Sequence, residues 1–167
     1  GGGRGPQNVP GTVRGRAQWR HVQEVFDPDT YFQGQVSYLS DQNFLEQFYK
    51  AEFDLGPNQE TFAYLTHRYR NLWGSVLAEP KLGRNWNTQT EWLPRVDGAV
   101  TGESFWDLFV YNARANAGYG LLRPAQMTPF SVQPTDQRVD TGRFDLLQEL
   151  SAPFDLGPVR LAPYGVL

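Results

Sequence analysis

The chain has 167 residues, a formal net charge of -3 and no cysteine, so disulfide scaffolds, thiolate metal sites and cysteine nucleophiles are excluded. With 40% hydrophobic and 14% aromatic residues it is too apolar to be disordered, and its mean hydropathy of -0.54 is too polar for a bundle of membrane helices. The length suits one domain, and the absence of excess positive charge argues against a nucleic-acid partner.

Residues 1–11 are rich in glycine and proline and are expected to be a linker or loop, which leaves 12–167 as the domain. The chain starts with Gly1 rather than Met and shows no signal peptide, and it ends in mid-pattern, so we expect a piece of a longer protein. No apolar run approaches the roughly 18 residues of a spanning helix, although a transmembrane strand needs only about 9–11 residues.

The first periodic segment, 13–25, alternates between apolar and polar residues as a strand does. Ala17 and Trp19 are therefore predicted to share a face opposite Arg16 and Arg20. The turn residues Asp27-Pro28-Asp29 follow, and alternation then resumes up to Tyr38, which predicts a hairpin.

The segment 43–53 breaks the alternation, and a short helix capped by Asp41 or a strongly bent strand fits it equally well. A second hairpin is predicted around Arg70-Asn71. Further strands are expected at 88–97, 104–122, 142–154 and 159–167, with a long loop at 123–141 and about eight strands in all.

One pentapeptide occurs twice, at 53–57 and at 154–158, as Phe-Asp-Leu-Gly-Pro. Five residues are too few to indicate a repeat architecture, so we interpret both copies as the same turn chemistry at two hairpin ends. The second copy predicts a turn followed by a returning strand over 159–167.

Catalytic groups are sparse. His21 and His67 have no metal-ligand spacing around them, and no nucleophile elbow, phosphate loop or dinucleotide fingerprint is present. Glycosidase-type pairs are conceivable at Asp27 with Asp29 and at Glu46 with Glu52, but turn and surface roles explain them better. We therefore expect no enzyme, no catalytic residue, no cofactor and no metal.

The aromatic residues favour an outer-membrane barrel, because many of them fall near predicted strand ends, where such barrels place aromatic girdles. These residues are Trp19, Trp73, Trp86, Trp92, Trp106, Phe26, Tyr31, Tyr38, Tyr111 and Tyr119. Charges inside the predicted strands, such as Asp107 and Arg114, suit a water-filled lumen. An open soluble sheet with one wet face is the alternative.

Three segments in order, 38–49, 59–65 and 90–98, resemble the barrel domain of the lipopolysaccharide-assembly outer-membrane protein family (LptD, also called organic-solvent-tolerance protein), in a version similar to that of planctomycete-like bacteria. The resemblance covers about 12–122. The matching motif residues are Ser40, Asp41, Phe44, Leu93 and Pro94, which we interpret as architectural: Asp41 ends a strand, and Pro94 bends it or interrupts its pairing.

The resemblance implies an all-β, antiparallel up-and-down meander that forms part of a transmembrane β-barrel in the cell outer membrane. It implies transport of lipopolysaccharide, with a plug lipoprotein and periplasmic bridge proteins as partners. The family's jellyroll domain and disulfide cysteines have no counterpart in these residues, and about eight strands are fewer than the family's roughly two dozen. We therefore expect a partial barrel that is an open curved sheet in isolation, in which the first strand, 13–25, does not pair with the last, 159–167.

A soluble antiparallel sandwich or small barrel that binds a sugar or a lipid on its aromatic face is the alternative function.

Overall fold

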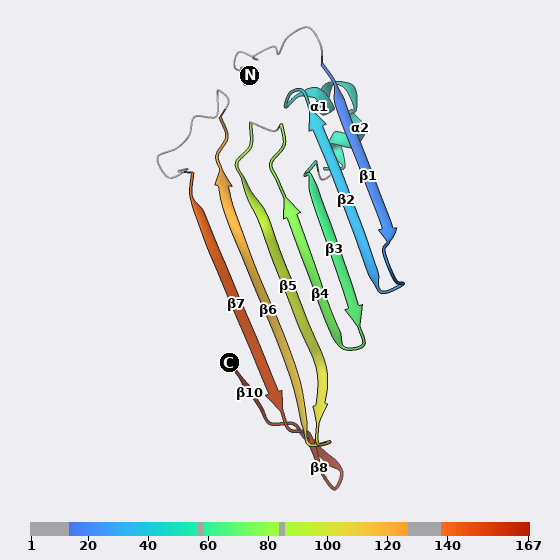
Figure 1. Ribbon diagram of the computed structural model, residues 1–167, viewed down its shortest axis with the longest axis vertical. Coiled ribbons are helices and arrows are strands. Elements are labelled where there is room, and N and C mark those ends of the chain that lie inside the picture. Colours follow the sequence, from blue (N-terminus) through green and yellow to red (C-terminus); the bar gives the residue numbers. More distant parts are fainter. Residues whose placement is uncertain (1–13, 57–58, 84–85, 127–137) are drawn as a thin grey trace.

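The structure is a computed structural model that describes residues 14–56, 59–83, 86–126 and 138–167. Its main feature is an eight-stranded antiparallel sheet whose first seven strands follow one another in chain order (Figure 1). Those strands are β1 (Arg16–Glu24), β2 (Thr30–Leu39), β3 (Phe62–Tyr69), β4 (Leu72–Glu79), β5 (Gln89–Phe105), β6 (Phe109–Arg123) and β7 (Asp140–Ser151), and β10 (Tyr164–Val166) is the eighth. The predicted all-β meander of sequential hairpins is confirmed.

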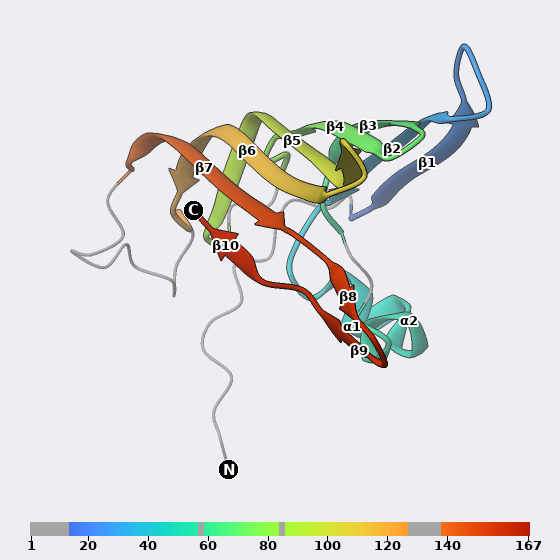
Figure 2. The same ribbon diagram turned by 90° about the horizontal axis from the view of Figure 1, so that it is seen from below.

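Two smaller units accompany the sheet. A separate hairpin is formed by β8 (Phe154–Leu156) and β9 (Val159–Leu161), and two five-residue helices, α1 (Phe44–Phe48) and α2 (Lys50–Asp54), connect β2 to β3. Figure 2 shows the sheet as a shallow arch with α1 and α2 on its hollow side. In the described residues β1 and β10 are opposite edges of the sheet, which confirms that the first and last strands do not pair.

The register of the first hairpin is as predicted. Ala17 and Trp19 pair with Tyr38 and Val36, while Arg20 pairs with Gln35, without a bulge. Because successive side chains point to opposite sides, Ala17 and Trp19 lie on the face opposite the arginines.

Two predicted strand boundaries are wrong. The strand expected at 88–97 continues to Phe105, and the strand expected at 104–122 contains a turn before β6 begins at Phe109. Trp106 and Asp107 form this turn with φ of 53° and 56°. Left-handed backbone at a tryptophan is uncommon, and no glycine or proline marks the turn, so residue preferences for turns did not predict it.

The expected single strands at 142–154 and 159–167 are also wrong at their ends. β7 ends at Ser151 before Pro153, and the last segment divides at Pro163 into β9, which pairs with β8, and β10, which pairs with β7. Proline has no N–H to donate to a ladder, which explains both breaks.

Of the expected loop, 127–137 lies outside the described residues, as does the expected linker 1–11.

The ambiguous segment 43–53 forms helices, but Asp41 does not cap them. Asn43 is the N-cap of α1, and Asp41 Oδ1 instead accepts the backbone N–H of Asn43 at 3.1 Å. The first copy of the repeated pentapeptide ends α2, with Gly56 at φ 61° after the helix, and so is not at a hairpin end. The second copy does form the β8–β9 turn, with Gly157 at φ 60°.

The buried apolar core is small. Within the described residues it consists of Leu39, Phe44 and Leu45, with Trp86 packed against them. The cluster joins α1 to β2, and in the described part of the chain no second layer covers the remainder of the sheet.

A bulge in β5 shifts its pairing on both sides at Leu93-Pro94. Trp92 pairs with Gly120 and Arg95 with Gly118, and the neighbouring β4 shifts at the same place. One extra residue in β5 puts Trp92 and Arg95 on one face although they are three positions apart, with the Arg95 guanidinium 5.6 Å from the Trp92 ring.

We predict that Gly118→Val destabilises the sheet by about 1–3 kcal/mol, because it overpacks the site beneath Trp92. A Cβ at Gly118 would lie 3.1 Å from the Trp92 ring atoms, whereas one at Gly142 meets nothing within 4 Å. Urea unfolding of both variants measures the difference. Equal stabilities of Gly118→Val and the matched control Gly142→Val would contradict the packing argument.

Candidate functional site: an apolar face and a charged face

The paired register divides the sheet into two chemically different faces. Side chains that are opposite one another in a ladder share a face, so the pairings assign each strand residue to one side. One side, which we call the apolar face, carries Ala17, Trp19, His21, Gln23, Phe32, Gly34, Val36, Tyr38, Ala63, Leu65, His67, Tyr69, Leu72, Gly74, Val76, Ala78, Val96, Gly98, Val100, Tyr111, Ala113, Ala115, Ala117, Tyr119, Phe144, Leu146, Gln148 and Leu150.

Apart from Glu103, which pairs with Tyr111 at one end, the members of the apolar face include no aspartate, glutamate, lysine or arginine, and most of its large side chains are solvent-exposed. Val76 is 43% exposed, Val96 45% and Phe144 68%. Between Tyr111 and Tyr119 of β6 it extends for about 26 Å at about 3.3 Å per residue. Its two ends carry charge: Glu91, ion-paired with Arg123 at 2.6 Å, lies beyond Tyr119, and Glu103 lies opposite Tyr111 because a second bulge in β5 shifts the pairing between Val100 and Glu103.

The opposite side, which we call the charged face, carries most of the strand charges. Its polar members include Arg16, Gln18, Arg20, Glu24, Gln33, Gln35, Ser37, Tyr64, Thr66, Arg68, Ser75, Arg95, Asp97, Asn112, Arg114, Asn116, Arg143, Asp145 and Glu149. Two ion pairs join residues two positions apart, Arg95 to Asp97 at 2.9 Å and Arg143 to Asp145 at 2.5 Å.

The helices α1 and α2 lie over the charged face and are held there by arginine. Arg14 donates to both carboxylate oxygens of Asp41, at 2.8 and 2.5 Å, and Arg16 donates to both of Glu52, each at 2.6 Å. The guanidinium groups also lie over Phe48 and Tyr49, at 5.1 and 5.6 Å from the ring centroids. These hydrogen bonds hold the pKa of Asp41 and that of Glu52 below their ordinary values.

A second polar cluster closes the same end of the sheet at β4–β6. The Lys81 ammonium donates to the carbonyls of Asn87, Arg123 and Pro124, at 2.7, 3.2 and 3.3 Å. The buried Glu91 accepts from the Lys81 backbone N–H as well as from Arg123. This network fixes the ends of three neighbouring strands.

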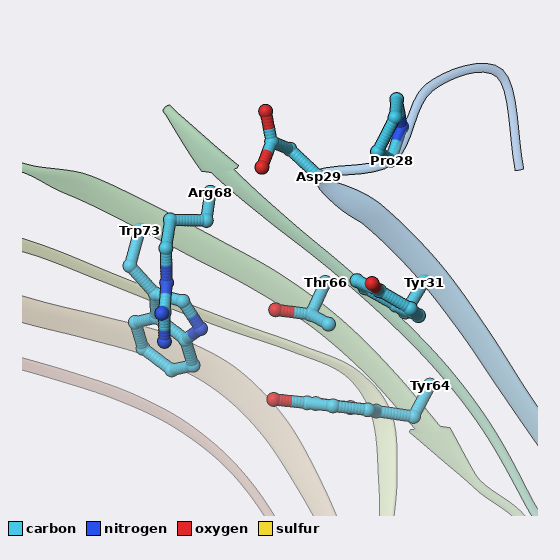
Figure 3. A pocket seen from close by; sticks show the side chains of 7 residues that line it. All are labelled: Pro28, Asp29, Tyr31, Tyr64, Thr66, Arg68 and Trp73. Atoms are coloured by element: carbon cyan, nitrogen blue, oxygen red, sulfur yellow. The ribbon is translucent and has the colours of Figure 1, made fainter. Parts of the chain in front are cut away.

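An open hollow of about 370 Å³ lies on the charged face near the β1–β2 turn, at the small end of the range for ligand sites. Figure 3 shows the side chains that line it, from the turn and from β2, β3 and β4. They are Pro28, Asp29, Tyr31, Tyr64, Thr66, Arg68 and Trp73. No sequence motif predicted this hollow, because its residues come from three strands and meet only through the register.

The predicted motif residues form two separate groups. Ser40, Asp41 and Phe44 lie together after β2: the Ser40 hydroxyl accepts the Gly15 N–H at 3.0 Å and donates to Asp41, and Phe44 is buried in the core. Leu93 and Pro94 lie in the β5 bulge, three strands away.

The two histidines and Glu52, which the sequence offered as conceivable metal-binding or catalytic groups, each have a structural partner. His67 Nδ1 is 2.7 Å from the Thr30 hydroxyl, His21 lies beside Gln23, and Glu52 is paired with Arg16. No group of three or more metal-ligating side chains occurs in the part of the chain that the structure describes.

The aromatic residues expected at girdles divide between the faces. Trp19, Tyr38, Tyr111 and Tyr119 lie on the apolar face, whereas Tyr31, Trp73 and Trp92 lie on the charged face. Phe26 and Trp106 lie in turns and are 95% and 84% exposed.

No family model, curated protein or solved structure matches this chain. Among the described residues there is no helix long and apolar enough to cross a membrane.

We predict that the stability contributed by Asp41 depends on pH. A carboxyl whose pKa is lowered in the folded state stabilises the fold above its unfolded pKa, about 3.9, and loses that contribution as the pH falls through the folded value. Urea unfolding should therefore show wild type more stable than Asp41→Asn at pH 7, and this difference should shrink steadily as the pH falls below about 3.9. Arg14→Gln should remove the same difference, and a difference that does not shrink with falling pH would contradict the assignment.

Proposed function

We propose that this sheet is part of an outer-membrane β-barrel of the lipopolysaccharide-assembly type. The observation that carries the membrane proposal is the apolar face: an exposed surface on seven neighbouring strands whose one acidic residue, Glu103, lies at its end, opposite a face rich in charge. Soluble monomers rarely expose an apolar patch of this extent, whereas barrel strands alternate between lipid-facing apolar and lumen-facing polar residues.

The dimensions and the aromatic residues support a lipid environment. Barrels present an apolar band about 25 Å tall between aromatic girdles, and the apolar face extends for about 26 Å along β6. On that strand Tyr111 and Tyr119 flank Ala113, Ala115 and Ala117. Interfacial tyrosines around small lipid-facing residues fit this pattern.

The connections between strands favour one orientation. Residues 25–29, 70–71 and 106–108 make short turns at one end of the sheet, and the connections 40–61, 80–88 and 124–139 are at the other (Figure 1). The connection 152–163, which carries the β8–β9 hairpin, is the one longer connection at the short-turn end in the described residues. Outer-membrane barrels have short periplasmic turns and longer extracellular loops. In the proposed orientation α1 and α2 lie inside the barrel, near its outer mouth.

The open sheet edges support a larger barrel. Strand groups without partners in lipid cost several kcal/mol each, so β1 and β10 need neighbours that complete a closed ring. We propose that further strands of the same type supply them, and that the function is transport without bond-making chemistry.

The assignment to lipopolysaccharide rests on the resemblance of 38–49, 59–65 and 90–98 to the LptD family. On that basis the proposed cargo is lipopolysaccharide, the partners are a plug lipoprotein and periplasmic bridge proteins, and the location is the cell outer membrane.

We predict that Val96→Arg lowers insertion into membranes, while Asn116→Arg leaves it nearly unchanged. Arginine on the lipid face costs up to about 2–4 kcal/mol, and Val96 lies within the apolar band, whereas Asn116 lies on the charged face between Asp97 and Asp145. Carbonate-washed membranes from cells expressing each variant measure the retained fraction. Equal retention of both variants would contradict the assignment of faces, and wild type in the soluble fraction would favour the soluble sugar- or lipid-binding sheet.

We predict that the 167-residue chain alone does not release lipopolysaccharide from liposomes and conducts no ions, because an incomplete ring leaves two edges open. A longer parent protein, reconstituted in parallel, should do both. Conductance by the 167-residue chain alone would indicate a small self-contained barrel.

A further inference from the structure

The hollow on the charged face is assembled by strand pairing. Tyr31 of β2, Thr66 of β3 and Ser75 of β4 are in one row across the ladder, and Arg68 and Trp73 are in the next row towards the turn. Asp29 stands at the rim (Figure 3). Rows on one face are about 6.6 Å apart, so the side chains of both rows reach the same space.

Several polar groups at the hollow have no partner within the described residues. The Arg68 guanidinium makes no ion pair or side-chain hydrogen bond, in contrast to Arg95 and Arg143 on the same face. The hydroxyls of Tyr31 and Tyr64 and the indole N–H of Trp73 likewise make no hydrogen bond to the described part of the chain.

A further hydroxyl lies behind the lining of the hollow. Ser75 pairs with Thr66, is only 5% exposed, and its Oγ has no hydrogen-bond partner in the described structure. Because Ser75 is not among the residues that line the hollow, it adds a polar group next to the site and not a contact with the ligand.

We propose that this hollow binds a phosphorylated hexose. A guanidinium without a carboxylate partner binds a phosphate through two parallel hydrogen bonds. Tyr31, Tyr64 and Trp73 offer apolar ring surface for the C–H groups of a pyranose together with hydroxyl and N–H donors, and Asp29 accepts from a sugar hydroxyl. The volume of about 370 Å³ suits one sugar unit rather than a chain.

The ligand chemistry has two possible sources, a free sugar phosphate and the phosphorylated sugar of a glycolipid. Both present the same groups to Arg68 and Trp73. The inference does not depend on the membrane proposal, because binding is measured in detergent solution whether or not the chain inserts into a bilayer.

Calorimetric titration of the full 167-residue chain in detergent tests the proposal with glucose 6-phosphate, glucose and inorganic phosphate. Glucose 6-phosphate is expected to bind at least about tenfold more tightly than either component, because charge and ring contacts act together. A phosphorylated glycolipid in mixed micelles is the fourth probe. Tighter binding of the glycolipid identifies a lipid-borne ligand, and tighter binding of glucose 6-phosphate identifies a free one.

Variants separate the contribution of the phosphate contact from that of the aromatic ring contact. Arg68→Gln should weaken glucose 6-phosphate binding by about tenfold or more and leave glucose binding unchanged, and Trp73→Leu should weaken both. Arg68→Lys keeps the charge without the two-pronged geometry and should give an intermediate loss.

Arg114→Gln is the matched control, because Arg114 shares the row and face of Arg68 three strands away, at about 14 Å. It should bind as wild type does. The proposal is overturned if Arg68→Gln, folded by circular dichroism, binds glucose 6-phosphate like wild type, if Arg114→Gln loses as much, or if inorganic phosphate binds as tightly as glucose 6-phosphate.

Discussion

The strict two-residue alternation of side chains, kept in step by ladder pairing across the strands, governs the rest of this structure. A shift of one residue in one strand exchanges its two faces, so a slip in β1 would move Arg16 and Arg20 onto the apolar face. The β5 bulge shows how the alternation is preserved in the presence of Trp92. With one extra residue at Leu93-Pro94, Trp92 stays on the charged face above two glycines of β6. The valines Val96 and Val100 still lie on the apolar face. The missing N–H of Pro94 lies where the ladder is already interrupted, so the proline breaks no pairing that the register requires.

The separation of faces leaves the sheet without an apolar interior of its own. Domains bury the apolar side of a sheet against a second layer, yet among the described residues the one buried apolar cluster joins Leu39 to the short helices and covers one corner. Five residues are too few for a helix to persist alone, so α1 and α2 depend on this cluster and on Arg14 and Arg16. Both arginine–carboxylate pairs are part-buried and doubly hydrogen-bonded, so together with the cluster they hold the helices on the hollow side. The layer that the apolar face requires must therefore come from outside the described residues, and the proposed lipid environment supplies it.

The parts of this fold that were predictable from the sequence are those in which the polarity of each residue indicates which face of the sheet it occupies. Alternation in 13–38 gave the first hairpin and its faces, since each side chain's polarity indicates its side. The Trp106-Asp107 turn gave no signal, because its left-handed backbone is imposed by the strands that it joins. The repeated pentapeptide shows the same limit: its phenylalanine is helical in α2 at Phe53 and extended in β8 at Phe154, whereas the glycine three positions later has the same left-handed conformation in both copies. The hollow was missed because Tyr31, Arg68 and Trp73 become neighbours only through the pairing of β2 with β3 and of β3 with β4.

The charged face balances several of its charges locally, and this limits where selectivity can arise. Strand period places residues i and i+2 side by side, and Arg95 with Asp97 and Arg143 with Asp145 use that spacing to neutralise one another. Arg14 and Arg16 are neutralised by carboxylates of the connection between β2 and β3. Neutralised pairs exert little field beyond a few ångströms in salt solution, so a diffusing anion meets attraction mainly at an arginine without a carboxylate partner. Among the described residues Arg68 has no such partner and also stands beside aromatic rings, which makes the turn end of the charged face its most selective region.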